Sequence, residues 1–156
     1  MKRGFTLIEM VITVAIISLL ASVALPMAEL EVQRSKEQDL RIALRQIRSA
    51  LDAYRQAVEE GRVTNGIAQS GYPPALKVLV EGVPDAGSPD RKRRIYFLRR
   101  IPRDPMFDDP ARPDEESWGI RSYASSFDAP EEGDDVFDVY SLSPAAGLNG
   151  INYRNW

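Results

Sequence analysis

Hydrophobic residues follow two patterns along this chain of 156 residues. The first is an unbroken apolar run from Phe5 to Leu25, in which Glu9 is the only ionisable side chain. At about 1.5 Å per residue, a helix of this length covers about 30 Å, the thickness of the hydrocarbon core of a bilayer. Lys2 and Arg3 come just before it, and basic residues stay on the cytoplasmic side of a membrane. The pattern predicts one transmembrane helix with a cytoplasmic N-terminus.

Three simpler explanations of the apolar run compete with a specialised one. A secretory signal peptide would need a small-residue cleavage site after its apolar core, and Ala21, Ser22 and Ala24 are the candidates, but the run is long for that class. A plain single-pass anchor also fits the length. The buried helix of a soluble protein fits less well, because basic residues flank the run.

Glu9 favours the specialised explanation. A carboxylate near one end of a membrane span is costly unless it is protonated, reaches the interface or finds a partner. If the chain were cut between Gly4 and Phe5, the new amine of Phe5 could lie beside Glu9 of a neighbouring copy. Each charge would then offset the desolvation cost of the other.

The second pattern is a helical stripe in which apolar residues recur every three or four positions opposite a charged face. The apolar positions are Leu40, Leu44, Ile47, Leu51, Tyr54 and Val58, and the charged ones are Arg41, Arg45, Arg48, Asp52, Arg55 and Glu59. The stripe predicts an amphipathic helix that ends near Gly61 and packs on the chain's own globular domain, with a coiled-coil partner as the alternative. Pro26 lies between the two patterns and predicts a kink, a locally melted segment or a helix end, of which the stripe favours the first two.

Shorter elements are predicted in the second half of the chain. Residues 75–80 follow two prolines and predict a short helix. Alternating polarity predicts strands at 120–124 and 136–140, with a turn at 130–135. The basic residues 91–94 are interpreted as an exposed loop or as a patch for a neighbouring subunit.

Composition limits what the chain can do. Hydrophobic residues make up 44% and charged residues 28%, enough for one small globular domain and a long helix. The net charge of -3 offers no basic face to a nucleic acid. There is no histidine or cysteine, which removes the commonest general base, thiol nucleophiles and disulfides, and no Gly-rich phosphate loop occurs. An enzyme is therefore not expected.

Residues 2 to 10, Lys-Arg-Gly-Phe-Thr-Leu-Ile-Glu-Met, resemble the processing site of type IV prepilins and type II secretion pseudopilins. The resemblance implies that a prepilin peptidase cuts after Gly4 and methylates the amine of Phe5. Glu9 then matches the glutamate that the family keeps at the fifth mature position. Pro26 matches a helix-disturbing proline found in many members.

The rest of the chain resembles the major pseudopilin of type II secretion systems, through short pieces that occur in the family order. They are Tyr72-Pro73, Tyr96 with Leu98, Ile101-Pro102, Asp104-Pro105, Asp138-Val139-Tyr140-Ser141 and the C-terminal Trp156. Type IVa pilins usually carry a disulfide loop near the C-terminus, whereas this chain has no cysteine. The resemblance therefore implies the secretion filament, or pseudopilus, rather than a pilus.

The same resemblance implies a structural calcium ion, which major pseudopilins hold after the last strand through aspartates and backbone carbonyls. Residues 141–152 occupy that position here and contain no carboxylate, so the site is predicted to be lost or much weakened. The loop is then expected to be held by apolar side chains, namely Leu148, Tyr153 and Trp156. Asp134 and Asp135 are weak alternative ligands and more readily form a solvated turn. No cofactor is expected.

Together these features predict an α+β, pilin-like fold, with a long N-terminal helix that spans the membrane in its first half and packs on a small antiparallel β-sheet domain. The expected parts are a leader at 1–4, a transmembrane and assembly helix at 5–25, its amphipathic continuation at 26–60 and a head domain at 61–156.

The resemblance implies a homo-oligomeric filament that drives protein export across the outer membrane. Its implied partners are the prepilin peptidase, an inner-membrane assembly platform and minor pseudopilins. The implied location is the bacterial inner membrane, with the head in the periplasm. The alternatives are a type IV pilin for adhesion, motility or DNA uptake, a membrane-tethered binding module that does not polymerise and, least favoured, a tethered enzyme.

Overall fold

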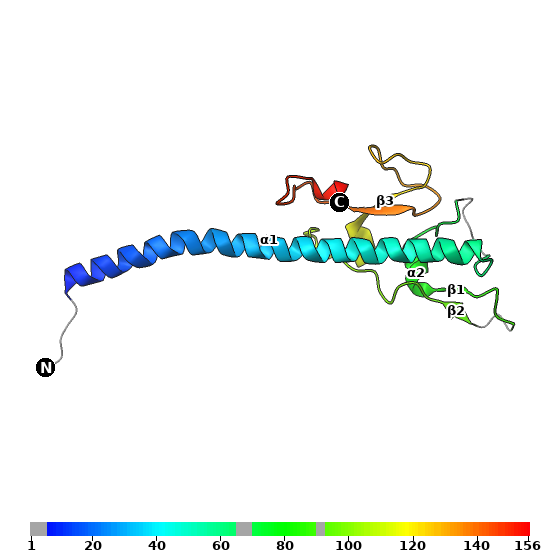
Figure 1. The fold of residues 1–156 in the computed structure, drawn as a ribbon, viewed down its shortest axis with the longest axis horizontal. Coiled ribbons are helices and arrows are strands. Elements are labelled where there is room, and N and C mark those ends of the chain that lie inside the picture. Colours follow the sequence, from blue (N-terminus) through cyan, green and yellow to red (C-terminus); the bar gives the residue numbers. More distant parts are fainter. Residues whose placement is uncertain (1–5, 65–69, 90–92) are drawn as a thin grey trace. The chain divides into compact units, whose positions relative to one another are not determined.

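The computed structural model describes residues 6–64, 70–89 and 93–156. Its contacts divide the chain into two compact units, Met1–Lys36 and Glu37–Trp156. The helix α1 (Leu7–Glu59) contributes to both units. The predicted α+β fold, a long N-terminal helix followed by small antiparallel sheets, is confirmed (Figure 1).

The first half of α1 carries exposed apolar side chains. The large hydrophobic side chains that the structure describes between Leu7 and Val32 are between 43% and 83% exposed. By length and composition, α1 could cross a membrane, and its most apolar window has no residue buried inside the structure. The helix continues without a break through Pro26, so the predicted continuation is confirmed and no melted segment is present there. An apolar surface this extensive requires a lipid or protein environment.

The second half of α1 forms one wall of the hydrophobic core. The predicted stripe is confirmed, since Leu40, Ile47 and Tyr54 are fully buried and recur every seven residues. Three alanines lie at the same spacing and are also buried, namely Ala43, Ala50 and Ala57. Small side chains let other segments approach the helix closely, so the head packs on this face.

The end of α1 is determined by Gly61, as predicted. Gly61 has a φ of 71°, in the left-handed region that glycine adopts without strain. Its N–H donates to the carbonyl of Val58 at 2.9 Å, and the N–H of Arg62 donates to the carbonyl of Ala57 at 2.9 Å. These two bonds form a Schellman motif, which satisfies carbonyls that would otherwise lack partners.

A short helix and a two-stranded sheet follow. The predicted helix is present as α2 (Lys77–Glu81), with Leu79 fully buried. Strand β1 (Val83–Pro84) pairs antiparallel with β2 (Arg94–Ile95). In the view of Figure 1, this sheet and α2 lie on one side of the second half of α1, while β3 lies on the other.

The second sheet joins β3 (Trp118–Arg121) to β4 (Asp138–Ser141), antiparallel, after a 3-10 turn at Asp114–Ser117. Both strands are shifted from their predicted ranges of 120–124 and 136–140. Strand β3 ends before residue 124 because the N–H of Tyr123 donates to the side chain of Asp135 rather than to the opposite strand.

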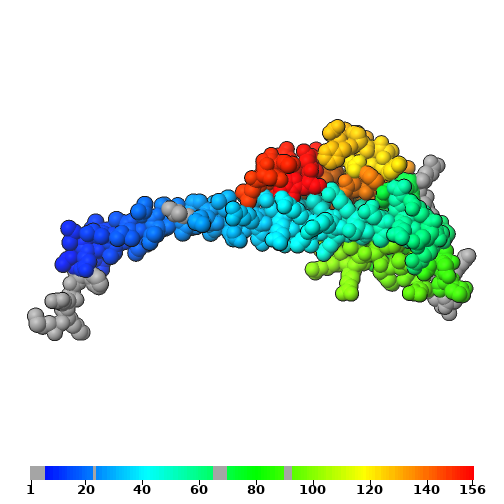
Figure 2. All heavy atoms as spheres, viewed as in Figure 1, coloured from blue at the N-terminus to red at the C-terminus, as the bar shows by residue number. Residues whose placement is uncertain are grey.

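The C-terminal segment includes a second 3-10 turn, Tyr153–Asn155. Figure 2 shows this segment, in red, beside yellow and orange residues of the last third of the chain and against the cyan part of α1. Tyr153 is buried among the core residues, and its ring meets that of Trp156 edge-on at 5.1 Å. The core thus lies between α1 and segments from the middle and last thirds of the chain.

Candidate functional site

The N-terminus of α1 is closed by two reciprocal hydrogen bonds. The backbone N–H of Glu9 donates to Thr6 Oγ1 at 3.3 Å, and the backbone N–H of Thr6 donates to Glu9 Oε2 at 3.4 Å. This is a capping box, which satisfies two N–H groups that have no partner inside the helix. The Thr-x-x-Glu spacing is visible in the sequence but formed no part of the predicted role of Glu9. The predicted processing residues, Gly4 and Phe5, lie outside the described residues.

The polar side chains within the apolar half of α1 are satisfied locally. The hydroxyls of Thr13, Ser18 and Ser22 donate to the carbonyls of Met10, Val14 and Leu19 at 2.7 to 2.9 Å. A hydroxyl that bonds its own helix carries little desolvation cost into an apolar environment. These residues therefore leave the surface of the helix effectively apolar.

Pro26 weakens this helix at one point. Proline has no N–H, so the carbonyl of Ser22, four residues earlier, receives no helical hydrogen bond. The helix is continuous at Pro26, but this turn has one backbone hydrogen bond fewer than the neighbouring turns.

An ion-pair cluster joins α1 to the second sheet. Arg48 Nε donates to Asp138 Oδ1 at 2.8 Å, and Arg121 donates to Asp138 Oδ2 at 3.2 Å. A terminal nitrogen of Arg48 also donates to the carbonyls of Val139 and Trp156 at 3.2 and 3.0 Å. The prediction that Arg48 belongs to a charged face opposite the core is therefore wrong for this residue, which is partly buried against the head.

Asp104 connects the proline-rich segment to strand β4 and to the 3-10 turn that precedes β3. It is fully buried, and its carboxylate accepts hydrogen bonds from the Ser141 hydroxyl at 2.6 Å and the Met106 N–H at 2.8 Å. Its own N–H donates to Ser117 Oγ at 3.1 Å. Burial raises the pKa of the Asp104 carboxyl above its ordinary value, although these hydrogen bonds and the charge of Arg103 oppose the increase.

The two predicted weak metal ligands, Asp134 and Asp135, differ in their surroundings. Asp135 is buried, and its Oδ1 accepts the N–H of Tyr123 at 2.8 Å, while Asp134 is exposed. Within the described ranges, no three carboxylates come together in a way that could hold a metal ion. Asp135 is therefore buried against the backbone of Tyr123 and does not belong to the solvated turn that was expected.

The C-terminal loop is held differently from the prediction. The side chain of Leu148 is 43% exposed and contributes little packing. Its backbone N–H, however, donates to Glu37 Oε1 on α1 at 2.7 Å. Tyr153 and Trp156 pack as predicted, and Arg41 lies over the Trp156 ring at 4.5 Å. The sequence did not single out Glu37, because it lies in a stretch of exposed charged residues.

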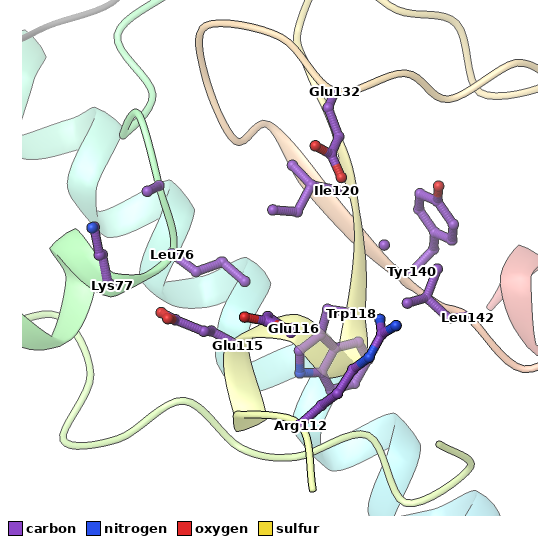
Figure 3. Close-up of a pocket in the computed structure, with 12 residues that line it drawn as sticks. Leu76, Lys77, Arg112, Glu115, Glu116, Trp118, Ile120, Glu132, Tyr140 and Leu142 are labelled. Carbon is purple, nitrogen blue, oxygen red and sulfur yellow. The ribbon is translucent and has the colours of Figure 1, made fainter. Parts of the chain in front are cut away.

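A cavity of about 490 Å³ opens beside the second sheet (Figure 3). Trp118, Ile120, Tyr140 and Leu142 form its apolar part, and charged side chains surround them. The charged residues are Lys77, Arg112, Glu115, Glu116 and Glu132. The residues that line the cavity include no serine or threonine.

Comparison with known proteins adds one finding. Residues 1–25 match the family described as the prokaryotic N-terminal methylation motif. No curated protein and no solved structure gave a significant match. The matched segment contains the Gly4–Phe5 junction, Glu9 and the apolar residues of α1 as far as Leu25. This motif implies processing by a prepilin peptidase and assembly into a filament, and it fits a single-pass membrane anchor. The motif and the α+β fold behind it support a place for this chain in the type IV pilin-like superfamily.

Proposed function

We propose that this protein is a structural subunit of a type II secretion pseudopilus, which polymerises and drives protein export across the outer membrane. The proposal rests on the methylation motif at residues 1–25, followed by a helix whose apolar side chains are exposed. Such a helix needs lipid before assembly and apolar neighbours afterwards. One surface can serve both states because lipid tails and aliphatic side chains are similarly apolar.

In this proposal, a prepilin peptidase cuts after Gly4 and methylates the amine of Phe5. Residues 5–25 then form the transmembrane and assembly helix, 26–60 its amphipathic continuation and 61–156 the head. Before assembly the subunit lies in the inner membrane with its head in the periplasm. An inner-membrane assembly platform extracts it, and minor pseudopilins join the same filament.

Glu9 sets the axial position of each subunit in the proposed filament. Its carboxylate pairs with the amine of Phe5 in a neighbouring copy. In the apolar filament interior, each charge offsets the desolvation cost of the other, and a mismatched register leaves both unpaired. The missing hydrogen bond at Pro26 gives the helix a weak point that can open during extraction.

Processing is tested by mass spectrometry of the chain expressed with an active or an inactive prepilin peptidase. The expected product lacks the first four residues and carries one added methyl group. Replacing Gly4 with a bulky residue, as in Gly4→Leu, should block cleavage and serve as the control. An unchanged mass with the active peptidase would support a plain membrane tether instead.

Secretion is separated from pilus function by gene deletion in the native cell. Loss of extracellular enzymes, with twitching and DNA uptake intact, is the result expected for a pseudopilus subunit. The absence of cysteine favours this outcome, because the disulfide loop usual in type IVa pilins cannot form. The reverse pattern of defects would assign the chain to a pilus.

A further inference from the structure

The loop from Leu142 to Asn152 is folded by hydrogen bonds to its own oxygen atoms. The carbonyl of Ile151 accepts the N–H of Gly147 at 2.9 Å and Nε1 of Trp156 at 3.2 Å. The carbonyl of Gly147 accepts the N–H of Gly150 at 2.9 Å. An isolated bridge joins residues 146 and 152 at the base of the loop.

Because these oxygen atoms already accept hydrogen bonds, the loop offers a poor set of oxygen ligands for calcium. Calcium takes six to eight oxygen ligands, several of them carboxylates. The loop contains no carboxylate, and its Asn149 Oδ1 accepts the N–H of Ile151 at 3.0 Å. The calcium ion that the pseudopilin resemblance implies therefore does not fit the residues present here.

A single carboxylate from α1 reaches the loop instead. Glu37 is 7% exposed, and its Oε1 accepts the N–H of Leu148 at 2.7 Å and the hydroxyl of Tyr153 at 3.0 Å. Both donors lie more than 100 residues further along the chain, on the two sides of the Gly150 turn. Hydrogen bonds to an ionised acceptor are stronger than neutral ones, especially where water is excluded.

The surroundings of Glu37 match this contact. A Cβ atom at Gly147 would lie 2.4 Å from the Trp156 ring and 3.3 Å from Glu37 Oε1. Only a residue without a side chain lets the loop backbone come this close to both groups. Arg41 lies one helical turn after Glu37 on α1, and its guanidinium group lies 4.5 Å from the centre of the Trp156 ring.

We propose that Glu37 anchors the C-terminal loop to α1 and performs, without a metal ion, the positioning that bound calcium performs in other heads of this kind. The carboxylate collects an N–H and a hydroxyl from separate parts of the loop, so one helix side chain fixes its conformation. The head should then keep the same loop structure in the presence and absence of calcium. This inference does not depend on the kind of filament that the chain forms.

The test uses the full chain in detergent micelles. Thermal unfolding of the full chain is measured in EDTA and in millimolar calcium. Under the same two conditions, hydrogen exchange of the full chain is followed in the peptide fragment that covers residues 146–152. Glu37→Gln keeps the size of the side chain and removes its charge, and Tyr153→Phe removes one of the two donors. Asp39→Asn is the matched control, since it removes the same charge from an exposed position two residues away.

The expected result has three parts. Calcium leaves the Tm and the exchange of the wild-type loop unchanged. Glu37→Gln lowers the Tm by about 5 °C or more and speeds loop exchange about tenfold, because a charge-assisted acceptor is lost. Tyr153→Phe gives a smaller change in the same direction, and Asp39→Asn gives none.

Two results would overturn the proposal. A rise in Tm and slower loop exchange on adding calcium would reveal a metal site that the present donors do not suggest. Loop exchange in Glu37→Gln equal to that in Asp39→Asn would show that the carboxylate does not hold the loop.

Discussion

Nε of Arg48 lies 2.8 Å from Oδ1 of Asp138, which is 90 residues further along the chain. The same guanidinium group donates to the carbonyls of Val139 and Trp156. One side chain of α1 therefore binds strand β4 and the C-terminal segment together. The pair is partly exposed, so its contribution comes mainly from the geometry of several hydrogen bonds rather than from charge alone.

Arg48→Gln should lower the free energy of unfolding by about 1–3 kcal/mol, because Asp138 and two carbonyls lose a donor. Denaturant unfolding of the head, followed by tryptophan fluorescence, measures the change. Arg45→Gln is the matched control, since Arg45 is exposed on the same helix and should change stability by less than about 0.5 kcal/mol. Equal losses in the two variants would contradict a specific role for Arg48.

Asp104 should make stability depend on pH in a defined direction. Its pKa is raised in the folded state by burial, so the folded protein takes up a proton before the unfolded chain does as pH falls from neutral. The contribution of Asp104 to stability therefore increases as pH falls through the folded pKa toward the ordinary value of 3.8. It decreases again as pH rises.

The comparison with Asp104→Asn isolates this effect from the other carboxylates. The stability of the wild type relative to the variant should increase between pH 7 and pH 4, as measured by denaturant unfolding at several pH values. A difference that stays constant with pH would show that burial does not perturb this carboxyl.

Glu9→Gln should separate helix capping from charge pairing. Glutamine can serve in a capping box as glutamate does, but it carries no charge for the proposed amine of Phe5. Membrane insertion and cleavage should therefore be normal, while filaments visible by electron microscopy are lost. Thr6→Ala, which removes the cap and keeps the charge, should still assemble. Normal filaments from Glu9→Gln would refute the pairing.

A chain that begins at Glu29 should fold without detergent. The buried hydrophobic residues of the described structure lie between Leu40 and Tyr153, so this truncation removes exposed apolar residues and leaves the core intact. Analytical ultracentrifugation should show a monomer, and its Tm should match that of the head in the full chain. Aggregation or loss of cooperative unfolding would indicate that the apolar half of α1 contributes to the core.

Much of this fold could be predicted from the sequence because the information is local. A helix places every third or fourth residue on one face, so the spacing of Leu40, Ile47 and Tyr54 predicts both the helix and its buried side. The apolar run and Glu9 likewise depend on neighbouring residues alone. The strand boundaries were less predictable, because the N–H of Tyr123 bonds to Asp135 and that of Val136 to the carbonyl of Pro73.

The roles of charged residues were decided only by the tertiary structure. Glu37 and Arg48 have the same sequence character as their exposed neighbours Asp39 and Arg45. Their partners arrive from 90 to 116 residues away, and no local spacing encodes that approach. The sequence by itself determined where the chain is apolar and helical. The tertiary structure decided which carboxylates are buried and which guanidinium groups are paired, because burial and pairing depend on backbone that comes from elsewhere in the chain.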